Sequence, residues 1–206
     1  MGRVYRAVSL DDPSEDVAIK VILKERKFGP DDLLRFQKEA ALMSRLLHQN
    51  IICFHELGLL DPVQALRARE LVGGYYIVME FANGTNLKES LQLHGRKSLE
   101  VFFDISTQVA SALDYTHGKN IIHRDIKPQN IVVGKSFQDQ KKTSVKVLDF
   151  GVARLAEALN YSGERSLEEI AGTPLYMAPE QTSLMRAPID HRVDLYSLGC
   201  VLYEVL

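Results

Sequence analysis

Residues 123–130 read His-Arg-Asp-Ile-Lys-Pro-Gln-Asn, which brings a carboxylate, an ammonium group and an amide into one short segment. The apolar pair Ile121-Ile122 precedes this segment, and the apolar run Ile131-Val132-Val133 follows it. Such flanks are typical of a loop held between two short buried strands. A solvated polar turn is the alternative, but it does not explain the two apolar runs. The sequence therefore predicts an ordered polar loop.

The side chains in this loop suit phosphoryl transfer. Asp125 can accept a proton from an incoming hydroxyl group, and Lys127 can neutralise charge on the moving phosphoryl group. The side-chain oxygen of Asn130 can ligate a hard cation, which prefers oxygen ligands. Phosphoryl transfer depends on positioning and charge neutralisation more than on covalent help. The three residues therefore indicate a phosphotransferase.

Further motifs follow and precede the loop in a fixed order. Val-Ala-Ile-Lys ends at Lys20, Asp149-Phe150-Gly151 follows the loop, and Ala-Pro-Glu closes at Glu180. With His-Arg-Asp-x-Lys-x-x-Asn between them, these motifs match the protein-kinase signature set. The chain thus resembles the eukaryotic-type protein kinase family, in its serine/threonine class. Its sequences Ala178-Pro179-Glu180-Gln181 and Asp190 to Gly199 look most like those of bacterial members.

The resemblance assigns the first part of the chain to nucleotide binding. Gly2 and Val4 correspond to the end of the glycine-rich flap over the phosphates, whose first glycines would precede Met1. Lys20 would pair with the α- and β-phosphates, and Glu39 would orient Lys20. An ion pair of Glu39 with a neighbouring arginine of its own helix is the alternative for that residue.

The resemblance also implies an adenine site and a metal site. Residues 79–84 would form the hinge between two lobes, with Met79 behind the adenine and the backbone of Glu80 and Ala82 at its edge; a plain strand end is the alternative. Ala18 and Val132 would complete the adenine pocket. ATP and Mg²⁺, or Mn²⁺, are the implied cofactors, and the implied metal ligands are Asn130 and Asp149.

The remaining motif residues would organise the activation segment, residues 151–180. Thr173 would bond Asp125 and Lys127 and favour Ser/Thr substrates. Glu169 could offer Arg124 a permanent anionic partner, or it could be one of two acids on a solvated loop. The structural set implied by the resemblance is Arg124, Phe150 (stacked between His123 and Met43), Gly151, Thr173, Glu180 and Asp194. Residues 123–130 correspond to the catalytic loop of the family, and Asp194 would brace the backbone of this loop.

Composition sets further limits. The chain has 206 residues, of which 46% are hydrophobic, so it can bury a sizeable core. Its formal net charge of −2 indicates neither a nucleic-acid nor a membrane partner. No apolar run approaches the roughly 20 residues that a membrane span needs. The two cysteines, Cys53 and Cys200, are expected to be buried free thiols, which suits a cytoplasmic location.

The expected fold is α+β with two lobes. Residues 1–81 would form a small antiparallel β lobe with one helix, with strands near 2–8, 17–22, 51–54 and 75–79 and the helix near 33–47. Residues 82–206 would form a mainly helical and incomplete large lobe. Thr85 could cap a first, short helix of this lobe, Ser98 could cap a longer second one, and a last helix would begin near Ile189. A further strand would cover 145–148.

Three functions fit this pattern. The first is a protein serine/threonine kinase in signal transduction, which transfers the γ-phosphoryl group of ATP to protein hydroxyls. The second is a nucleotide-binding pseudokinase that acts as a scaffold, although the polar residues it would lack are present. The third is a catalytically impaired fragment, because the first glycines and the helices after the last one are not in this sequence. A small-molecule phosphotransferase fits less well, since the activation segment is complete.

Overall fold

The computed structural model describes residues 3–9, 12–13, 16–22, 41–59, 75–135, 142–150, 174–182 and 188–206. The chain divides into two compact units. The first unit contains Met1–Leu47 and Ile52–Ala82, and the second contains His48–Ile51 and Asn83–Leu206. The α+β fold expected from the sequence is confirmed, and each unit is described below by itself.

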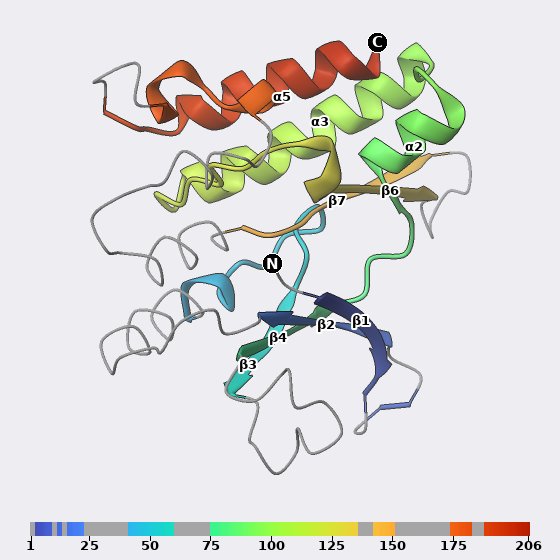
Figure 1. The fold of residues 1–206 in the computed structure, drawn as a ribbon, viewed down its shortest axis with the longest axis vertical. Coiled ribbons are helices and arrows are strands. Elements are labelled where there is room, and N and C mark those ends of the chain that lie inside the picture. The colour runs from blue at the N-terminus through green and yellow to red at the C-terminus, as the bar shows by residue number, and fades with distance from the viewer. Residues whose placement is uncertain are drawn as a thin grey trace. The chain divides into compact units, whose positions relative to one another are not determined.

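The first unit is built on a four-stranded antiparallel sheet in the order β1-β2-β4-β3 (Figure 1). Its strands are β1 (Arg3–Val8), β2 (Asp16–Ile22), β3 (Phe54–Leu59) and β4 (Tyr75–Glu80). The side chains of β4 alternate, with Tyr75, Ile77 and Met79 buried. This alternation is typical of a strand with one face in the core. Of the helix expected near 33–47, residues 41–47 are described: residues 41–43 are helical, whereas residues 44–47 are not, so the helix ends earlier than expected.

One sequence prediction in this region is wrong. The apolar residues 51–54 were expected to form one strand, but β3 begins only at Phe54. Ile51 instead forms an isolated parallel bridge with Val147 of the second unit, and only 2% of its surface is exposed. An apolar run by itself does not show which core it enters, so the local pattern could not reveal that the run is divided.

A close approach across the first sheet requires a glycine. Gly58 of β3 pairs with Tyr76 of β4, and a Cβ atom at Gly58 would lie 2.2 Å from the Tyr76 ring. The Tyr76 hydroxyl donates a hydrogen bond to Glu56 Oε1 at 2.9 Å, and this bond is the largest cause of the raised pKa of Tyr76. The Tyr76 ring thus covers the backbone of β3 at Gly58, the position that has no side chain.

The second unit combines a small sheet with three described helices. The sheet has the order β5-β6-β7, and its strands are β5 (Thr85–Asn86), β6 (Ile131–Lys135) and β7 (Thr143–Val147). The helices are α2 (Leu87–His94), α3 (Leu99–His117) and α5 (Arg192–Val205). Short 3₁₀ turns lie at Pro128–Asn130, Pro174–Tyr176 and Pro179–Gln181.

The caps of two helices test the sequence predictions. Ser98 caps α3 as predicted, because its side chain accepts a hydrogen bond from Val101 N. The cap predicted for α2 is wrong: Asn86 rather than Thr85 accepts the bond from Glu89 N, at 2.9 Å. Thr85 instead pairs with Val133 in the sheet. The two neighbours are both good caps, so only the strand pairing decides between them.

The long helix α3 forms the centre of the second unit. It contacts both β7 and α5, and α5 runs beside it in Figure 1. The side chains on its buried face are Ile105, Val109, Ala112, Leu113 and Thr116. Gln108 ties α3 to the start of β7, because its Nε2 donates to Thr143 O at 2.8 Å and its Oε1 accepts from Val145 N at 3.1 Å.

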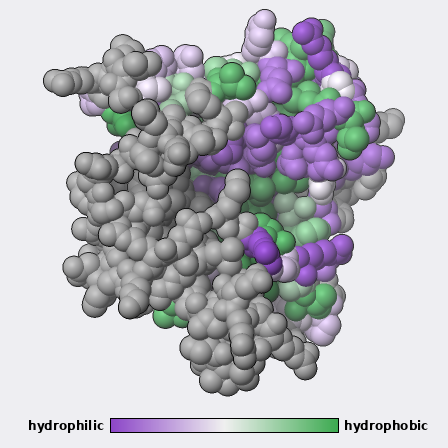
Figure 2. All heavy atoms as spheres, in the orientation of Figure 1, coloured by the Kyte–Doolittle hydropathy of each residue, from purple (hydrophilic) through white to green (hydrophobic). Residues whose placement is uncertain are grey.

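The face of the described residues that Figure 2 shows is mixed in polarity. Figure 2 shows many hydrophilic side chains in this view, with apolar side chains between them. Single exposed apolar residues are ordinary on a protein surface. Among the helices that the structure describes, none combines the length and apolarity that crossing a bilayer requires.

Residues 48–51 belong to the second unit although residues of the first unit flank them. Asn50 Nδ2 donates to Gln108 Oε1 at 2.8 Å and to Val145 O at 2.9 Å, and Asn50 O accepts from Val147 N at 2.8 Å. His48 stacks on Tyr115 with 5.1 Å between ring centroids. These contacts fix the segment to α3 and β7.

We predict that Gly58→Ala destabilises the protein by about 1–3 kcal/mol, because the Tyr76 ring must move and its bond to Glu56 is lost. Urea denaturation measures the effect. Gly199→Ala is the matched control: Gly199 lies in α5 with nothing within 4 Å of its Cβ position. This control should be neutral or stabilise by up to about 1 kcal/mol. An equal response of both variants would contradict the role of Tyr76.

The environment of His48 predicts a dependence of stability on pH. Burial, and secondly the charge of Lys146, lower the pKa of His48 below 6.5. Its Nδ1 accepts from Asn50 N and its Nε2 lies 3.2 Å from Ser111 Oγ, while Lys119 lies over the stacked Tyr115 ring. Because the unfolded chain binds this proton more readily, the free energy of unfolding should fall as pH drops below about 6.5.

His48→Gln should reduce this fall, since glutamine does not titrate. Chemical denaturation between pH 7.5 and pH 5.0 measures the slope for both proteins. The same slope in the variant and the parent chain would show that His48 does not cause the dependence.

Candidate active site

The polar loop predicted from the sequence is anchored by its few apolar residues. Ile126 is 1% exposed, and Pro128 begins the 3₁₀ turn that closes with a hydrogen bond from Asn130 N to Lys127 O at 2.9 Å. β6 follows directly, as predicted. The strand expected at residues 121–122 is wrong, because both described residues are half-buried and form no strand. The helix α3 precedes the loop, and Ile121 N donates a hydrogen bond to Thr116 O, in the last turn of α3, at 2.9 Å.

The structure brings three predicted residues of this loop together. Lys127 Nζ lies 2.7 Å from Asp125 Oδ2. Asn130 Nδ2 donates to the same Oδ2 at 3.0 Å and to the backbone oxygen of Asp125 at 2.8 Å. The side chain of Asp125 keeps 39% of its surface exposed and that of Lys127 keeps 20%. The carboxylate is therefore oriented by two neighbours and still open to solvent.

Asn130 and Asp149 lie at the same end of the β6–β7 pair. Ile131 pairs with Val147, and Leu148 N donates to Asn130 O at 2.8 Å, so the next residue, Asp149, follows beside Asn130. The backbone of Asp149 is left-handed, with φ 60°. Because Nδ2 of Asn130 is bound to Asp125, its Oδ1 is the atom suited to a cation. The pair thus offers the oxygen ligands that Mg²⁺ prefers.

His123 connects the loop to the end of β7. Its side chain is fully buried, its Nδ1 accepts from Asp125 N at 3.2 Å, and its Nε2 donates to Leu148 O at 2.8 Å. These two bonds require the Nε2–H tautomer. The ring meets Phe150 edge to face, with 4.5 Å between centroids. The sequence implied only the aromatic contact, since hydrogen bonds to a backbone leave no sequence signal.

Asp194 holds the backbone of the loop from the first turn of α5. Its fully buried carboxylate accepts from His123 N at 2.8 Å and from Arg124 N at 2.7 Å. This is the contact that the resemblance implied. His117 Nε2 donates to the same carboxylate at 2.7 Å, which the sequence did not indicate. Several donors and the helix N-terminus compensate the cost of burying the charge.

The end of the activation segment also reaches the loop. Arg124 has a left-handed backbone, with φ 67°, and its carbonyl oxygen accepts from Gln181 Nε2 at 2.9 Å. Glu180 is half-buried. Its charge adds to that of Asp190, the larger cause, in raising the pKa of Arg192. Glu180 therefore lies within electrostatic reach of a positive charge on α5.

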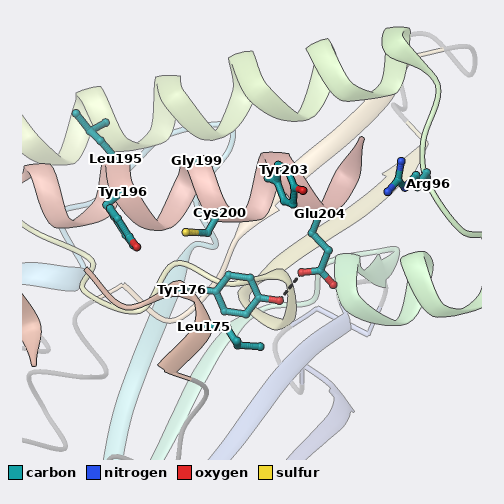
Figure 3. Close-up of a pocket in the computed structure, with 9 residues that line it drawn as sticks. All are labelled: Arg96, Leu175, Tyr176, Leu195, Tyr196, Gly199, Cys200, Tyr203 and Glu204. Carbon is teal, nitrogen blue, oxygen red and sulfur yellow. Dashed lines mark hydrogen bonds between the residues drawn. The ribbon is translucent and has the colours of Figure 1, made fainter. Parts of the chain in front are cut away.

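A separate groove lies beside α5, with a volume of about 860 Å³ (Figure 3). The Tyr176 hydroxyl donates to Glu204, and burial together with this bond raises the pKa of Tyr176. Ser197 Oγ donates to Tyr176 O at 2.6 Å. The groove is lined by Arg96, Leu175, Tyr176, Leu195, Tyr196, Gly199, Cys200, Tyr203 and Glu204. None of the predicted site residues is among the described residues that line the groove. The hydrogen bonds of Tyr176 to Ser197 and Glu204 fix the 174–176 turn to α5.

In the first unit, the sheet register places predicted nucleotide-binding residues on one face. Lys20 of β2 pairs with Val4 of β1, and Ala18 pairs with Met79 of β4. Side chains opposite each other, or two residues apart on one strand, share a face. Val4, Ala18, Lys20 and Met79 therefore project from the same side of the sheet.

The end of β4 is held by Cys53. Glu80 N donates to Cys53 O at 2.8 Å, and Glu80 Oε2 accepts from Cys53 N at 3.1 Å. The N–H of Glu80 is thus used within the first unit. Ala82, the last residue of this unit, is half-buried.

The other predicted positions divide into two groups. Val132 of β6 is 9% exposed, and Phe150 is 3% exposed. Four predicted residues lie outside the described part of the chain, and so does Glu169: they are Gly2, Glu39, Gly151 and Thr173.

Comparison with known proteins agrees with this geometry. The chain matches the protein kinase domain family over residues 1–206. It is 34% identical over 189 residues to a probable serine/threonine-protein kinase of Clostridium acetobutylicum, covering 92% of this chain and 25% of that protein. It is 36% identical over 194 residues to the serine/threonine-protein kinase PknB of Mycobacterium tuberculosis, covering 93% and 28%.

Solved structures give the same result. The crystal structure of Rad53 in complex with AMP-PNP matches with a TM-score of 0.71 and 27% identity, over 100% of this chain and 44% of that chain. The kinase domain of Mycobacterium tuberculosis PknI matches with a TM-score of 0.69 and 26% identity, over 100% and 67%.

The fold and the polar loop define a protein kinase domain. The chain belongs to the protein kinase family, and the curated relatives given above are serine/threonine-protein kinases. It spans about a quarter of the length of those relatives, at 25% and 28%.

We predict that Asp194→Asn lowers the free energy of unfolding by about 2–4 kcal/mol, because an amide replaces one acceptor oxygen with a donor that faces N–H groups. Urea denaturation measures the loss. Asp190→Asn is the control in the same region: Asp190 is bound to Arg192, which holds the pKa of Asp190 at about 2. Asp190 is a solvent-exposed partner, so its substitution should cost less. Equal losses would contradict the bracing role of Asp194.

Proposed function

We propose that this kinase domain transfers the γ-phosphoryl group of ATP to serine or threonine hydroxyls of protein substrates. The observation that carries the proposal is the arrangement of Asp125, whose Oδ2 is bound by Lys127 Nζ at 2.7 Å and by Asn130 Nδ2 at 3.0 Å. The serine/threonine-protein kinases among its relatives support the substrate class.

Asp125 is the residue to which we assign the proton acceptor. Because Oδ2 is engaged by Lys127 and Asn130, Oδ1 is the oxygen that would meet a substrate hydroxyl, and the exposed carboxylate permits this approach. General-base assistance of this kind contributes about 10²–10⁴-fold to a rate. Lys127, already beside Asp125, would offset negative charge at the transferred group.

ATP with Mg²⁺ or Mn²⁺ is the cofactor set that fits these residues. Asn130 and Asp149 would hold the metal, which supplies charge neutralisation at the phosphates when bound. The residues that we assign to nucleotide contact are Gly2, Val4, Ala18, Lys20, Met79, Glu80, Ala82 and Val132. The AMP-PNP complex of Rad53, a structural neighbour, supports the use of ATP.

A phosphoryl-transfer assay tests the proposal, with ATP, Mg²⁺ and a generic protein substrate rich in serine and threonine. Asp125→Asn should lower kcat by about 10²–10⁴-fold and leave nucleotide binding in place, because the amide cannot accept the proton. Asp149→Ala should remove the Mg²⁺ dependence of nucleotide binding, which calorimetry measures. Glu100→Gln, on the exposed first turn of α3, is the control and should leave both unchanged.

Two results would reject the proposal. One is nucleotide binding without any phosphoryl transfer by the parent chain, which fits the scaffold or the catalytically impaired fragment instead. The other is full activity of the Asp125→Asn variant, which would place the proton acceptor elsewhere.

A further inference from the structure

The side chain of Gln181 bridges two backbone groups that are far apart in the sequence. Its Nε2 donates to the carbonyl oxygen of Arg124 at 2.9 Å, and its Oε1 accepts from the N–H of Ala178 at 3.2 Å. The donor and the acceptor end of the amide are therefore both used, which fixes its orientation. One end holds a local turn, and the other end holds the catalytic loop.

The carbonyl that Gln181 binds belongs to an unusual residue. Arg124 has φ 67°, a left-handed conformation that costs energy for a residue with a side chain. Its N–H is bound by Asp194 Oδ1 at 2.7 Å, so both backbone polar groups of Arg124 are held by side chains from other parts of the fold. Such a conformation persists where the surroundings determine it from several sides.

The same carbonyl lies in the peptide group that leads into Asp125. A peptide group is planar, so the direction of its C=O sets the direction of its N–H. In this peptide the Arg124 oxygen is bound by Gln181, and the Asp125 N–H is bound by His123 Nδ1 at 3.2 Å. Gln181 and His123 thus fix the plane from which the Asp125 side chain starts.

Gln181 itself is held in place by the turns around it. Gln181 N donates to the carbonyl of Ala178 at 2.9 Å, and Ala178 is fully buried. Nearer the start of this segment, Tyr176 is tied to α5 through Ser197 and Glu204. The contact with Arg124 therefore comes from an anchored segment.

We propose that Gln181 is a positioning residue that sets the Arg124–Asp125 peptide, and through it Asp125, for phosphoryl transfer. This inference rests on the proposed function and adds to it a residue that the sequence motifs did not single out. A purely local role is the alternative, in which Gln181 only closes the 3₁₀ turn through Ala178.

Two substitutions of similar size separate these roles. Gln181→Glu keeps an acceptor for Ala178 N–H but turns an oxygen towards the Arg124 carbonyl, so only the contact with the loop is lost. Gln181→Met removes both hydrogen bonds. If Gln181 positions Asp125, both variants should lower kcat about tenfold or more, with the KM for ATP unchanged. Both should also raise the hydrogen-exchange rate of the Asp125 amide about tenfold, measured by NMR without nucleotide.

Gln108→Met is the matched control. Gln108 also donates to a backbone carbonyl and accepts from a backbone N–H, but these partners are Thr143 and Val145 of β7, and its Oε1 accepts in addition from Asn50 Nδ2. This variant should leave kcat and the exchange of the Asp125 amide within about twofold of the parent chain. Thermal unfolding of all variants shows that each is folded at the assay temperature.

Three results would overturn the inference. They are an unchanged kcat and unchanged exchange in Gln181→Met, losses in Gln181→Met but not in Gln181→Glu, or equal losses in Gln181→Met and Gln108→Met. The exchange measurement needs no substrate, so it decides the positioning role even if the parent chain transfers no phosphate. Absence of transfer would reject the proposed function alone.

Discussion

The second unit depends on one buried carboxylate, that of Asp194. A fully buried charge is tolerated only where donors surround it, and here the donors are the backbone N–H groups of His123 and Arg124 and the ring of His117. Because two of them are backbone groups of the catalytic loop, the need to satisfy this charge also determines the shape of the loop. The burial of the Asp194 carboxylate and the backbone geometry of the loop therefore depend on the same hydrogen bonds.

The loop shaped in this way contains little regular structure. It begins after a helix, includes the left-handed residue Arg124 and ends in a short 3₁₀ turn before β6. Hydrogen bonds from outside replace the missing regular pattern: Asp194 and Gln181 hold Arg124, and His123 reaches Leu148 at the end of β7. A rigid scaffold that positions an irregular polar loop is the usual basis of a functional site.

In the first unit, the predicted site residues are positioned by the regular sheet rather than by hydrogen bonds from distant side chains. A regular antiparallel sheet sets the side-chain direction, and the pairing of Lys20 with Val4 and of Ala18 with Met79 gathers predicted nucleotide-binding residues on one face. Here the register alone is sufficient, because alternate residues of a strand point to opposite sides. An alternating sequence predicts which side chains of a strand share a face, whereas it does not predict which side chains are positioned by long-range hydrogen bonds.

The sequence by itself determined the α+β class, the strands β2, β4 and β6, the Ser98 cap and the clustering of Asp125, Lys127 and Asn130, because each depends on residues close in the chain. Only the tertiary structure decided that Ile51 joins the second unit, that residues 121–122 form no strand, and that Asn86 rather than Thr85 caps α2. It also supplied His117 and Gln181. These outcomes depend on partners distant in sequence, and a local pattern of polar and apolar residues does not identify such partners.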